Sequence, residues 1–172
     1  IAIHAALTGH IVLSTLHTND AAGAIPRLID MKIEPFLITS SVNSIVAQRL
    51  ARRICPDCKK EYEPAPVGLQ TVQEVIKTLP NPERNQISGK LQFWKGTGCA
   101  QCNNTGYTGR VGLFEILAIT NTVKHLISER VSAADIAALA AKEGMITLKQ
   151  DGILKMLSGV TTIEEVFRVT KD

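Results

Sequence analysis

Residues 55–58 read Cys-Pro-Asp-Cys and residues 99–102 read Cys-Ala-Gln-Cys, and these two stretches hold every cysteine of the chain. Two cysteines three positions apart on a tight turn can direct both sulfur atoms at one metal ion. Two such pairs supply the four thiolates that complete the tetrahedral shell of structural zinc. The sequence therefore predicts one zinc ion held by four ligands, namely Cys55, Cys58, Cys99 and Cys102.

Glycines flank the second cysteine pair, with Gly96 and Gly98 before it and Gly106 and Gly109 after it. Glycine permits turns in which backbone N–H groups point inward, where they can donate hydrogen bonds to thiolate sulfur. The two pairs are separated by 40 residues, more than the roughly 15–20 usual in such motifs. We therefore expect the metal to close a sizeable inserted loop.

Two other uses of paired cysteines compete with the zinc site. Two disulfides would suit a secreted domain, but the chain shows no signal peptide and has enough apolar residues for a core without covalent links. A redox-active Cys-x-x-Cys is usually single and precedes a helix in a thioredoxin-like pattern. Thiolate-bound zinc suits a reducing compartment, so we expect a cytoplasmic protein.

The composition predicts a globular protein without a transmembrane helix. Apolar residues make up 45% of the 172 residues, and no apolar run reaches the roughly 18 residues that a span needs. The net charge is +3, and residues 51–110 hold the surplus, with nine basic and five acidic side chains. A zinc tetrathiolate is a dianion, so we expect nearby cations to offset it rather than to bind nucleic acid. These cations are Arg52, Arg53, Lys59, Lys60 and Arg110.

The first twenty residues combine an apolar helix, a glycine and an aliphatic run. Ile1–Thr8 has neither an N-cap nor an initial methionine, so we expect a fragment of a longer protein. Gly9 ends this helix, and residues 10–16 predict a strand buried on both faces, as in a parallel sheet. This order favours an α/β fold. Ligands bind beyond the carboxyl ends of such strands, which makes His17 a candidate ligand-facing residue.

Residues 8–21 read Thr-Gly-His-Ile-Val-Leu-Ser-Thr-Leu-His-Thr-Asn-Asp-Ala. They resemble the histidine box of the secretion ATPases, the hexameric motors of type II secretion and type IV pilus assembly. The similarity continues through residues 27–31, 34–38, 48–58, 98–102 and 105–115, and it leaves out only about residues 65–95. The cysteine pairs indicate the assembly and export branch, because retraction motors of the family generally lack them.

The resemblance implies a partial RecA-like core of the P-loop ATPase class, with this chain as the C-terminal part of the motor. His10 and His17 match the box histidines, which lie near the nucleotide phosphates or couple that site to domain movement. Thr15 and Thr18 are weaker candidates for binding the nucleotide, because hydroxyls there also cap helices. The implied cofactors are ATP and magnesium in the full-length parent, in addition to structural zinc.

The resemblance also implies partners and a location. The full-length parent would form a homo-hexamer, act on an inner-membrane platform protein and lie in the cytoplasm, peripheral to the inner membrane, without binding nucleic acid. The family's phosphate-binding loop, G-x-x-x-x-G-K-[ST], is absent from this chain, as are its aspartate box and its magnesium-binding acidic motif. We therefore expect this fragment alone not to hydrolyse ATP.

The remaining segments predict mostly helices. Prolines at positions 26 and 35 begin two helices, the insert holds one near residues 69–79, and strands are expected at residues 91–95 and 111–117. Residues 44–54 fit either a helix or a strand. Three C-terminal helices, capped by Ser132, Thr147 and Thr162, are expected to pack together.

We accordingly divide the chain into three parts: residues 1–54 as the end of the RecA-like core, 55–110 as the zinc module and 111–172 as a strand with a helical bundle. Two alternatives to a motor fragment remain open at this point. One is a zinc-ribbon nucleic-acid-binding protein, which the low aromatic content of 4% disfavours. The other is a structural adaptor without nucleotide chemistry.

Overall fold

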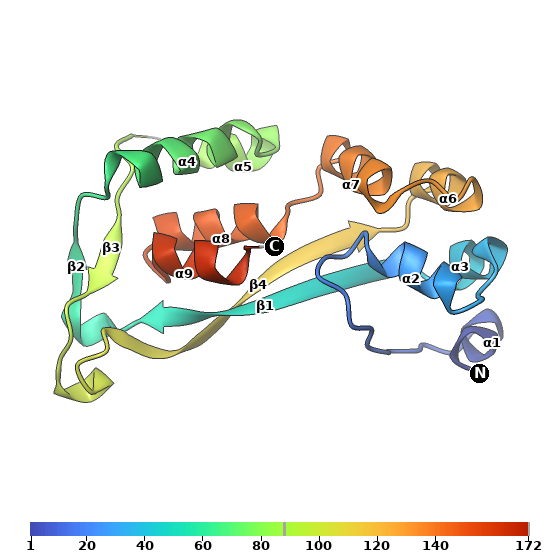
Figure 1. Ribbon diagram of the computed structural model, residues 1–172, viewed down its shortest axis with the longest axis horizontal. Helices are drawn as coiled ribbons and strands as arrows, with labels where there is room; N and C mark the ends of the chain where they lie inside the picture. Colours follow the sequence, from blue (N-terminus) through green and yellow to red (C-terminus); the bar gives the residue numbers. More distant parts are fainter. Residues whose placement is uncertain (88, 172) are drawn as a thin grey trace. The chain divides into compact units, whose positions relative to one another are not determined.

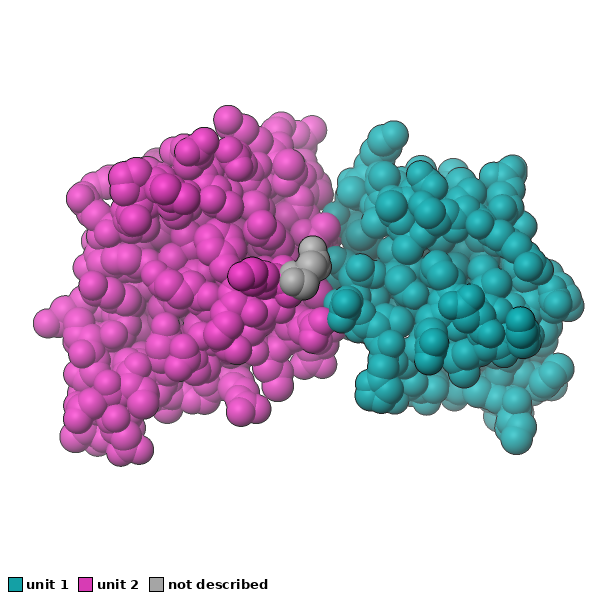
Figure 2. All heavy atoms as spheres, viewed as in Figure 1, with its two compact units in different colours: residues 1–47, 115–145 teal, residues 48–114, 146–172 magenta. Residues whose placement is uncertain are grey.

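The computed structural model describes residues 1–87 and 89–171, and the chain divides into two compact units (Figure 2). Unit 1 comprises residues 1–47 and 115–145, and unit 2 comprises residues 48–114 and 146–172. Each unit therefore combines two separate segments of the chain. The three-part division expected from sequence motifs stays a prediction.

The elements of unit 1 are helical except where the two long strands enter it (Figure 1). Its helices are α1 (Ala2–Leu7), α2 (Ala24–Asp30), α3 (Pro35–Ser41), α6 (Asn121–Ser128) and α7 (Ala133–Lys142). The long strands are β1 (Ser44–Ile54) and β4 (Tyr107–Ala118), which are neighbours in one two-stranded sheet. Pairing with β4 gives β1 its backbone partners, which decides the ambiguous residues 44–54 in favour of a strand.

Unit 2 contains the cysteine pairs, a short two-stranded sheet and four helices of the described residues. The helices are α4 (Pro66–Lys77), α5 (Asn81–Gln86), α8 (Leu148–Leu157) and α9 (Ile163–Val169). Two single 3₁₀ turns, Pro56–Cys58 and Ala100–Cys102, contain parts of the cysteine pairs. Strands β2 (Lys59–Glu61) and β3 (Trp94–Gly96) are antiparallel, with Lys60 opposite Lys95.

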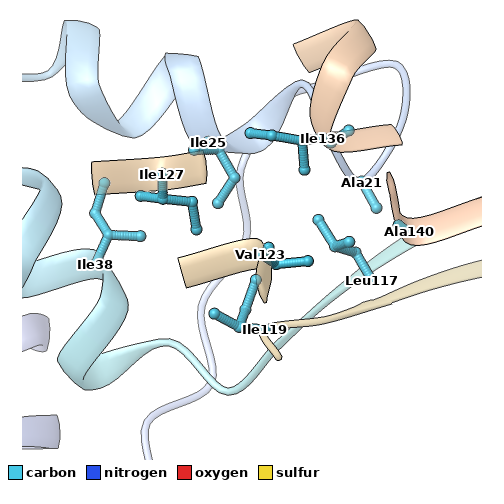
Figure 3. Packing of buried hydrophobic residues seen from close by; sticks show 10 residues of the cluster. Ala21, Ile25, Ile38, Leu117, Ile119, Val123, Ile127, Ile136 and Ala140 are labelled. Atoms are coloured by element: carbon cyan, nitrogen blue, oxygen red, sulfur yellow. The ribbon is translucent and has the colours of Figure 1, made fainter. Parts of the chain in front are cut away.

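The core of unit 1 is aliphatic (Figure 3). Helix α2 contributes Ile25, α3 contributes Ile38 and β4 contributes Leu117. Helices α6 and α7 complete the cluster with Val123, Ile127, Ile136 and Ala140. Full burial of one large aliphatic side chain contributes about 1.5–3 kcal/mol, so this cluster is the main source of stability in unit 1.

A smaller apolar cluster lies in unit 2 between α4, α8 and α9. Its buried members are Val72, Phe93, Ile153, Met156, Ile163 and Val166. Gly152 permits the close contact of α8 with α9, because a Cβ atom at this position would lie 2.6 Å from Cγ1 of Val166. The packing of α8 against α9 therefore requires glycine at position 152.

The C-terminal helices begin where the caps predict. The hydroxyl groups of Ser132, Thr147 and Thr162 accept hydrogen bonds from backbone N–H groups three positions later, which satisfies donors that a helix start leaves unpaired. Their packing differs from the prediction, however. Helix α7 packs with α6 in unit 1, whereas α8 packs with α9 and α4 in unit 2.

The predicted strand at residues 10–16 is wrong for this structure, in which that segment has no regular secondary structure. Ile11 and Leu13 are 95% and 93% exposed. A buried strand needs neighbouring strands on its edges, and among the described residues none pairs with this segment. Within the described part of the chain, no helix has both the length and the apolar content to cross a membrane.

Candidate metal centre

All four cysteines of the two pairs meet in unit 2, at the ends of elements that fix their positions. Cys55 follows β1, and Cys58 ends the first 3₁₀ turn, directly before β2. Cys99 directly precedes the second 3₁₀ turn and Cys102 ends it. Three of the cysteines are buried and Cys99 is half-buried. The four sulfur atoms all lie within 4.8 Å of one another.

The distances between sulfur atoms fit a tetrahedral metal site. A zinc ion with Zn–S bonds of about 2.3 Å separates its sulfur ligands by about 3.8 Å. The structure has 3.8 Å between the sulfur atoms of Cys55 and Cys99 and 3.7 Å between those of Cys99 and Cys102. The Cys58–Cys102 pair is separated by 3.9 Å. A disulfide needs about 2.05 Å, so the described sulfur–sulfur distances fit a metal site and are too long for disulfides.

Backbone N–H groups support the cluster as the glycine pattern predicts. The N–H groups of Cys99 and Gly106 each donate to the sulfur of Cys102 over 3.2 Å. Burial acts to raise the pKa of Cys102, but these hydrogen bonds lower the pKa to about 6. Burial raises the pKa of the neighbouring Cys58 to about 11. A divalent cation would supply the counter-charge that buried thiolates need.

Two glycines allow the turn after the second cysteine pair to approach β3 closely. A Cβ atom on Gly96 would lie 2.0 Å from the carbonyl oxygen of Gly106, and one on Gly106 would lie 2.6 Å from the oxygen of Gly96. Gly106 also has a φ of 76°, which glycine adopts without strain. The same Gly106 oxygen accepts a hydrogen bond from the N–H of Cys55 over 3.0 Å. This contact ties the two cysteine pairs together through backbone atoms.

Two of the cations expected to offset the thiolate charge are engaged elsewhere. The guanidinium of Arg52 binds Glu165 and lies 4.1 Å from the centre of the Tyr107 ring. The Nζ atom of Lys59 lies 4.6 Å from the centre of the Trp94 ring. These contacts cover one face of each aromatic ring, which also argues against base stacking there. Trp94 therefore packs against Lys59.

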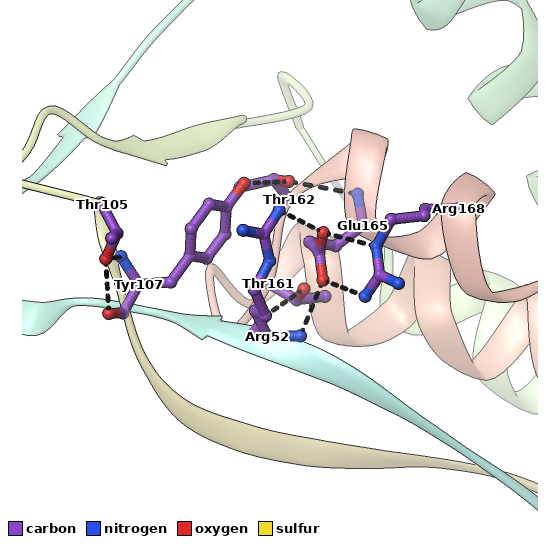
Figure 4. Close-up of polar contacts among 7 residues, drawn as sticks. All are labelled: Arg52, Thr105, Tyr107, Thr161, Thr162, Glu165 and Arg168. Carbon is purple, nitrogen blue, oxygen red and sulfur yellow. Dashed lines mark hydrogen bonds and ion pairs between the residues drawn. The ribbon is translucent and has the colours of Figure 1, made fainter.

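Glu165 is the centre of a polar network that sequence reasoning missed (Figure 4). Its side chain is 1% exposed. Arg168 donates two hydrogen bonds of 2.8 Å to it, and Arg52 donates from its guanidinium over 2.6 Å and from its backbone N–H over 2.9 Å. Arg168, followed by Arg52, holds the pKa of Glu165 at about 2, against the opposing effect of burial. The network fastens α9 to β1.

The histidine segment, residues 8–21, belongs to unit 1, whereas the four cysteines belong to unit 2. His10 and His17 are both exposed. The Thr8 hydroxyl lies 3.0 Å from Nδ1 of His10. The Thr18 hydroxyl donates to the carbonyl oxygen of Asp20, as a turn-forming threonine does. The proposed nucleotide roles of His10, His17, Thr15 and Thr18 stay predictions.

Glu115 is a second buried carboxylate that the sequence did not single out as functional. Its Oε1 atom accepts a hydrogen bond of 2.9 Å from the N–H of Ala21, the last residue of the histidine segment. A charged residue inside the apolar run of residues 111–117 is the signal that could have identified it, because buried carboxylates require hydrogen-bond donors. Glu115 anchors the C-terminal end of the histidine segment in unit 1.

Comparison with known proteins gives a family for the whole chain. The family model described as "Type II/IV secretion system protein" matches residues 1–168. A type IV pilus assembly ATPase PilB from Myxococcus xanthus is 45% identical over 96% of this chain. The type II secretion system protein E of Dickeya dadantii is 45% identical over the full chain, and the PilB ATPase of Thermus thermophilus is 44% identical over 99% of it. The chain spans 28%, 32% and 18% of the lengths of these relatives, respectively.

Proposed function

Because the chain belongs to the family of type II/IV secretion system proteins, we propose that it is the C-terminal part of an ATPase motor for type IV pilus assembly or type II protein secretion. The observation that carries this proposal is the identity of about 45% over essentially the whole chain to relatives named as such an ATPase or as the secretion protein E. Both systems remain candidates, since relatives from both are equally similar.

In this proposal, residues 1–54 complete a RecA-like core that the upstream part of the parent begins. The exposed Ile11 and Leu13 support it, because the segment from His10 to Leu16 would become a buried strand once upstream strands lie beside it. His17 would then stand at the carboxyl end of that strand, where a neutral imidazole can donate one hydrogen bond to a phosphate of ATP. His10, Thr15 and Thr18 would lie in the same region.

The zinc module would be a rigid attachment on the motor. Cys55, Cys58, Cys99 and Cys102 would hold the ion, and zinc bound by four cysteines is a closed structural site without an open position for catalysis. Its function would be to fix the inserted loop of residues 59–98 as a surface for a neighbouring subunit or an inner-membrane platform protein. ATP and magnesium would bind to the upstream part of the parent, which would work as a homo-hexamer at the cytoplasmic side of the inner membrane.

The test of the nucleotide role is His17→Ala in the full-length parent, with ATP turnover and thermal stability measured together. We expect turnover to fall with little change in the melting temperature. His125→Ala is the matched control, because the His125 side chain is 73% exposed on α6 and pairs only with Glu129 among the described residues. If turnover in the His17 variant equals that of the control, His17 has no part in the ATPase cycle.

A further inference from the structure

Two adjoining hollows on unit 2 are lined by arginines. The larger, about 480 Å³, is lined by Leu50, Arg52, Arg110 and Arg168. The smaller, about 300 Å³, shares Arg52 and Arg110 and is completed by Thr105, Tyr107 and Gly109. Volumes of this size lie in the range of small-molecule sites. No acidic side chain is among the described residues that line either hollow.

Two of the three guanidinium groups are held in place by the protein. Glu165 receives two hydrogen bonds from Arg168 and one from the guanidinium of Arg52, and the Tyr107 ring supports the Arg52 guanidinium from one side (Figure 4). Each guanidinium has five N–H donors. Glu165 therefore orients both groups while leaving donors free to face the hollow.

Arg110 adds a third positive charge without a counter-ion. Across the described residues, its side chain makes no hydrogen bond or ion pair. Three arginines and one glutamate leave the site with two positive charges in excess. A single carboxylate ligand would neutralise only half of that excess, whereas a phosphate monoester carries about 1.5–2 negative charges at neutral pH.

We propose that Arg52, Arg110 and Arg168 form a binding site for a phosphate group on unit 2. The planar fork of arginine matches the oxygen spacing of phosphate, and preformed arginines bind it with less loss of side-chain freedom. The ligand is a phosphate monoester, carried either by a soluble compound such as a nucleotide or by a lipid headgroup. The site lies outside the histidine segment and does not depend on the proposed ATPase function.

The direct test titrates the purified chain with inorganic phosphate and with AMP, followed by calorimetry and by the Nε–H resonances of its arginines. Because the chain contains no P-loop sequence, binding cannot arise from an ATPase site of that class. We expect saturable binding and shifts of the Arg52, Arg110 and Arg168 resonances. Arg110→Gln should weaken the affinity about tenfold, the effect of losing one charged hydrogen bond. It should not unfold the chain, because this side chain holds no described partner.

Arg53→Gln is the matched control. Like Arg110→Gln, it removes one positive charge. Arg53 follows Arg52 in β1, and neighbouring side chains of a strand point to opposite faces, so this variant should leave the affinity nearly unchanged. Binding of phosphatidic acid vesicles, lost in Arg110→Gln, would identify a lipid source; binding of AMP without vesicle binding would identify a soluble one. The proposal is overturned if the chain shows no saturable binding of phosphate or AMP at millimolar concentration and none of vesicles. It is also overturned if Arg110→Gln and Arg53→Gln weaken the affinity equally.

Discussion

In unit 1 the buried side chains are mainly aliphatic, with Glu115 as the buried charge, whereas unit 2 combines a smaller apolar cluster with four cysteines and the Glu165 network. An aliphatic core responds to the volume of its side chains. A metal site and an ion-paired carboxylate respond instead to metal activity and pH. The comparison therefore predicts that solution conditions act on unit 2 and that core mutations are needed to weaken unit 1.

The largest effect should come from the cysteines. Cys102→Ser removes one ligand and the sulfur that accepts two backbone hydrogen bonds, so we expect loss of zinc and loosening of unit 2. Zinc binding supplies about 10–16 kcal/mol in small zinc modules. Elemental analysis with a thiol count under denaturing conditions measures the metal, and the fluorescence of Trp94, the one tryptophan of the sequence, follows unit 2.

Ala100→Ser is the control for this variant, because it changes an exposed residue of the same turn and keeps all four thiols. It should retain one zinc ion per chain. A Cys102→Ser protein that also retained one zinc ion would show that the four-cysteine assignment is wrong. If Cys102→Ser lowered the melting temperature of unit 1 as much as that of unit 2, the two units would not respond separately to metal loss.

Ile127→Ala should give the next largest effect, and in the other unit. Ile127 is fully buried in the aliphatic cluster, so its truncation should cost about 2–5 kcal/mol through lost contacts and a cavity. Hydrogen exchange should speed up in α2 and α6, while the zinc content stays unchanged. Met31→Ala, at a residue that is 55% exposed in the same unit, should change stability by less than about 1 kcal/mol.

Glu165→Gln should destabilise unit 2 by about 2–3 kcal/mol, because two half-exposed guanidiniums lose their shared carboxylate. The folded-state pKa of Glu165, about 2, lies below that of an unfolded glutamate. The stability that ionised Glu165 gives to unit 2 is therefore fully present above about pH 4.5 and is lost as the pH falls toward 2. Acid titrations of both proteins should converge over this window. Glu164→Gln, the exposed neighbour, should leave the acid dependence in place.

Removing single caps should produce the smallest and most local effects. Ser132→Ala weakens the start of α7 in unit 1, and Thr147→Ala weakens the start of α8 in unit 2. Each should cost about 1 kcal/mol. Hydrogen exchange that quickens only in the unit of the altered cap sharpens the comparison. Equal acceleration throughout the chain in both variants would mean that the two units unfold as one.

Local signals in the sequence predicted local structure well. The cysteine spacing predicted that the four sulfur atoms meet, and the three hydroxyl caps predicted three helix starts. Within each cysteine pair and each cap, the groups that interact lie within three or four residues of one another. The glycine positions beside the second cysteine pair likewise predicted the N–H group that Gly106 directs at sulfur.

Apart from the meeting of the two cysteine pairs, contacts between distant residues could not be predicted from the sequence. Glu165 meets Arg52 across 113 positions, and Glu115 meets Ala21 across 94, so no local pattern connects these residues. The strand expected at residues 10–16 failed for a related reason, because the aliphatic run indicates burial but not whether a neighbouring strand is present. Charge counting was also insufficient, because it assigned Arg52 to the thiolates and not to Glu165.

The alternating use of the chain by the two units has a consequence for the order of folding during synthesis. Unit 1 needs residues 115–145, and unit 2 needs residues 146–172. When residue 114 has just emerged from the ribosome, neither unit has all of its parts, although both cysteine pairs are already present. Unit 1 has all of its parts once residue 145 has emerged, whereas unit 2 must wait for residues 146–172, so the two units can fold one after the other, as in many multidomain proteins, only with unit 1 first. The cysteine cluster can capture a metal ion before either unit is complete, which would make the metal the first long-range contact that a nascent chain forms.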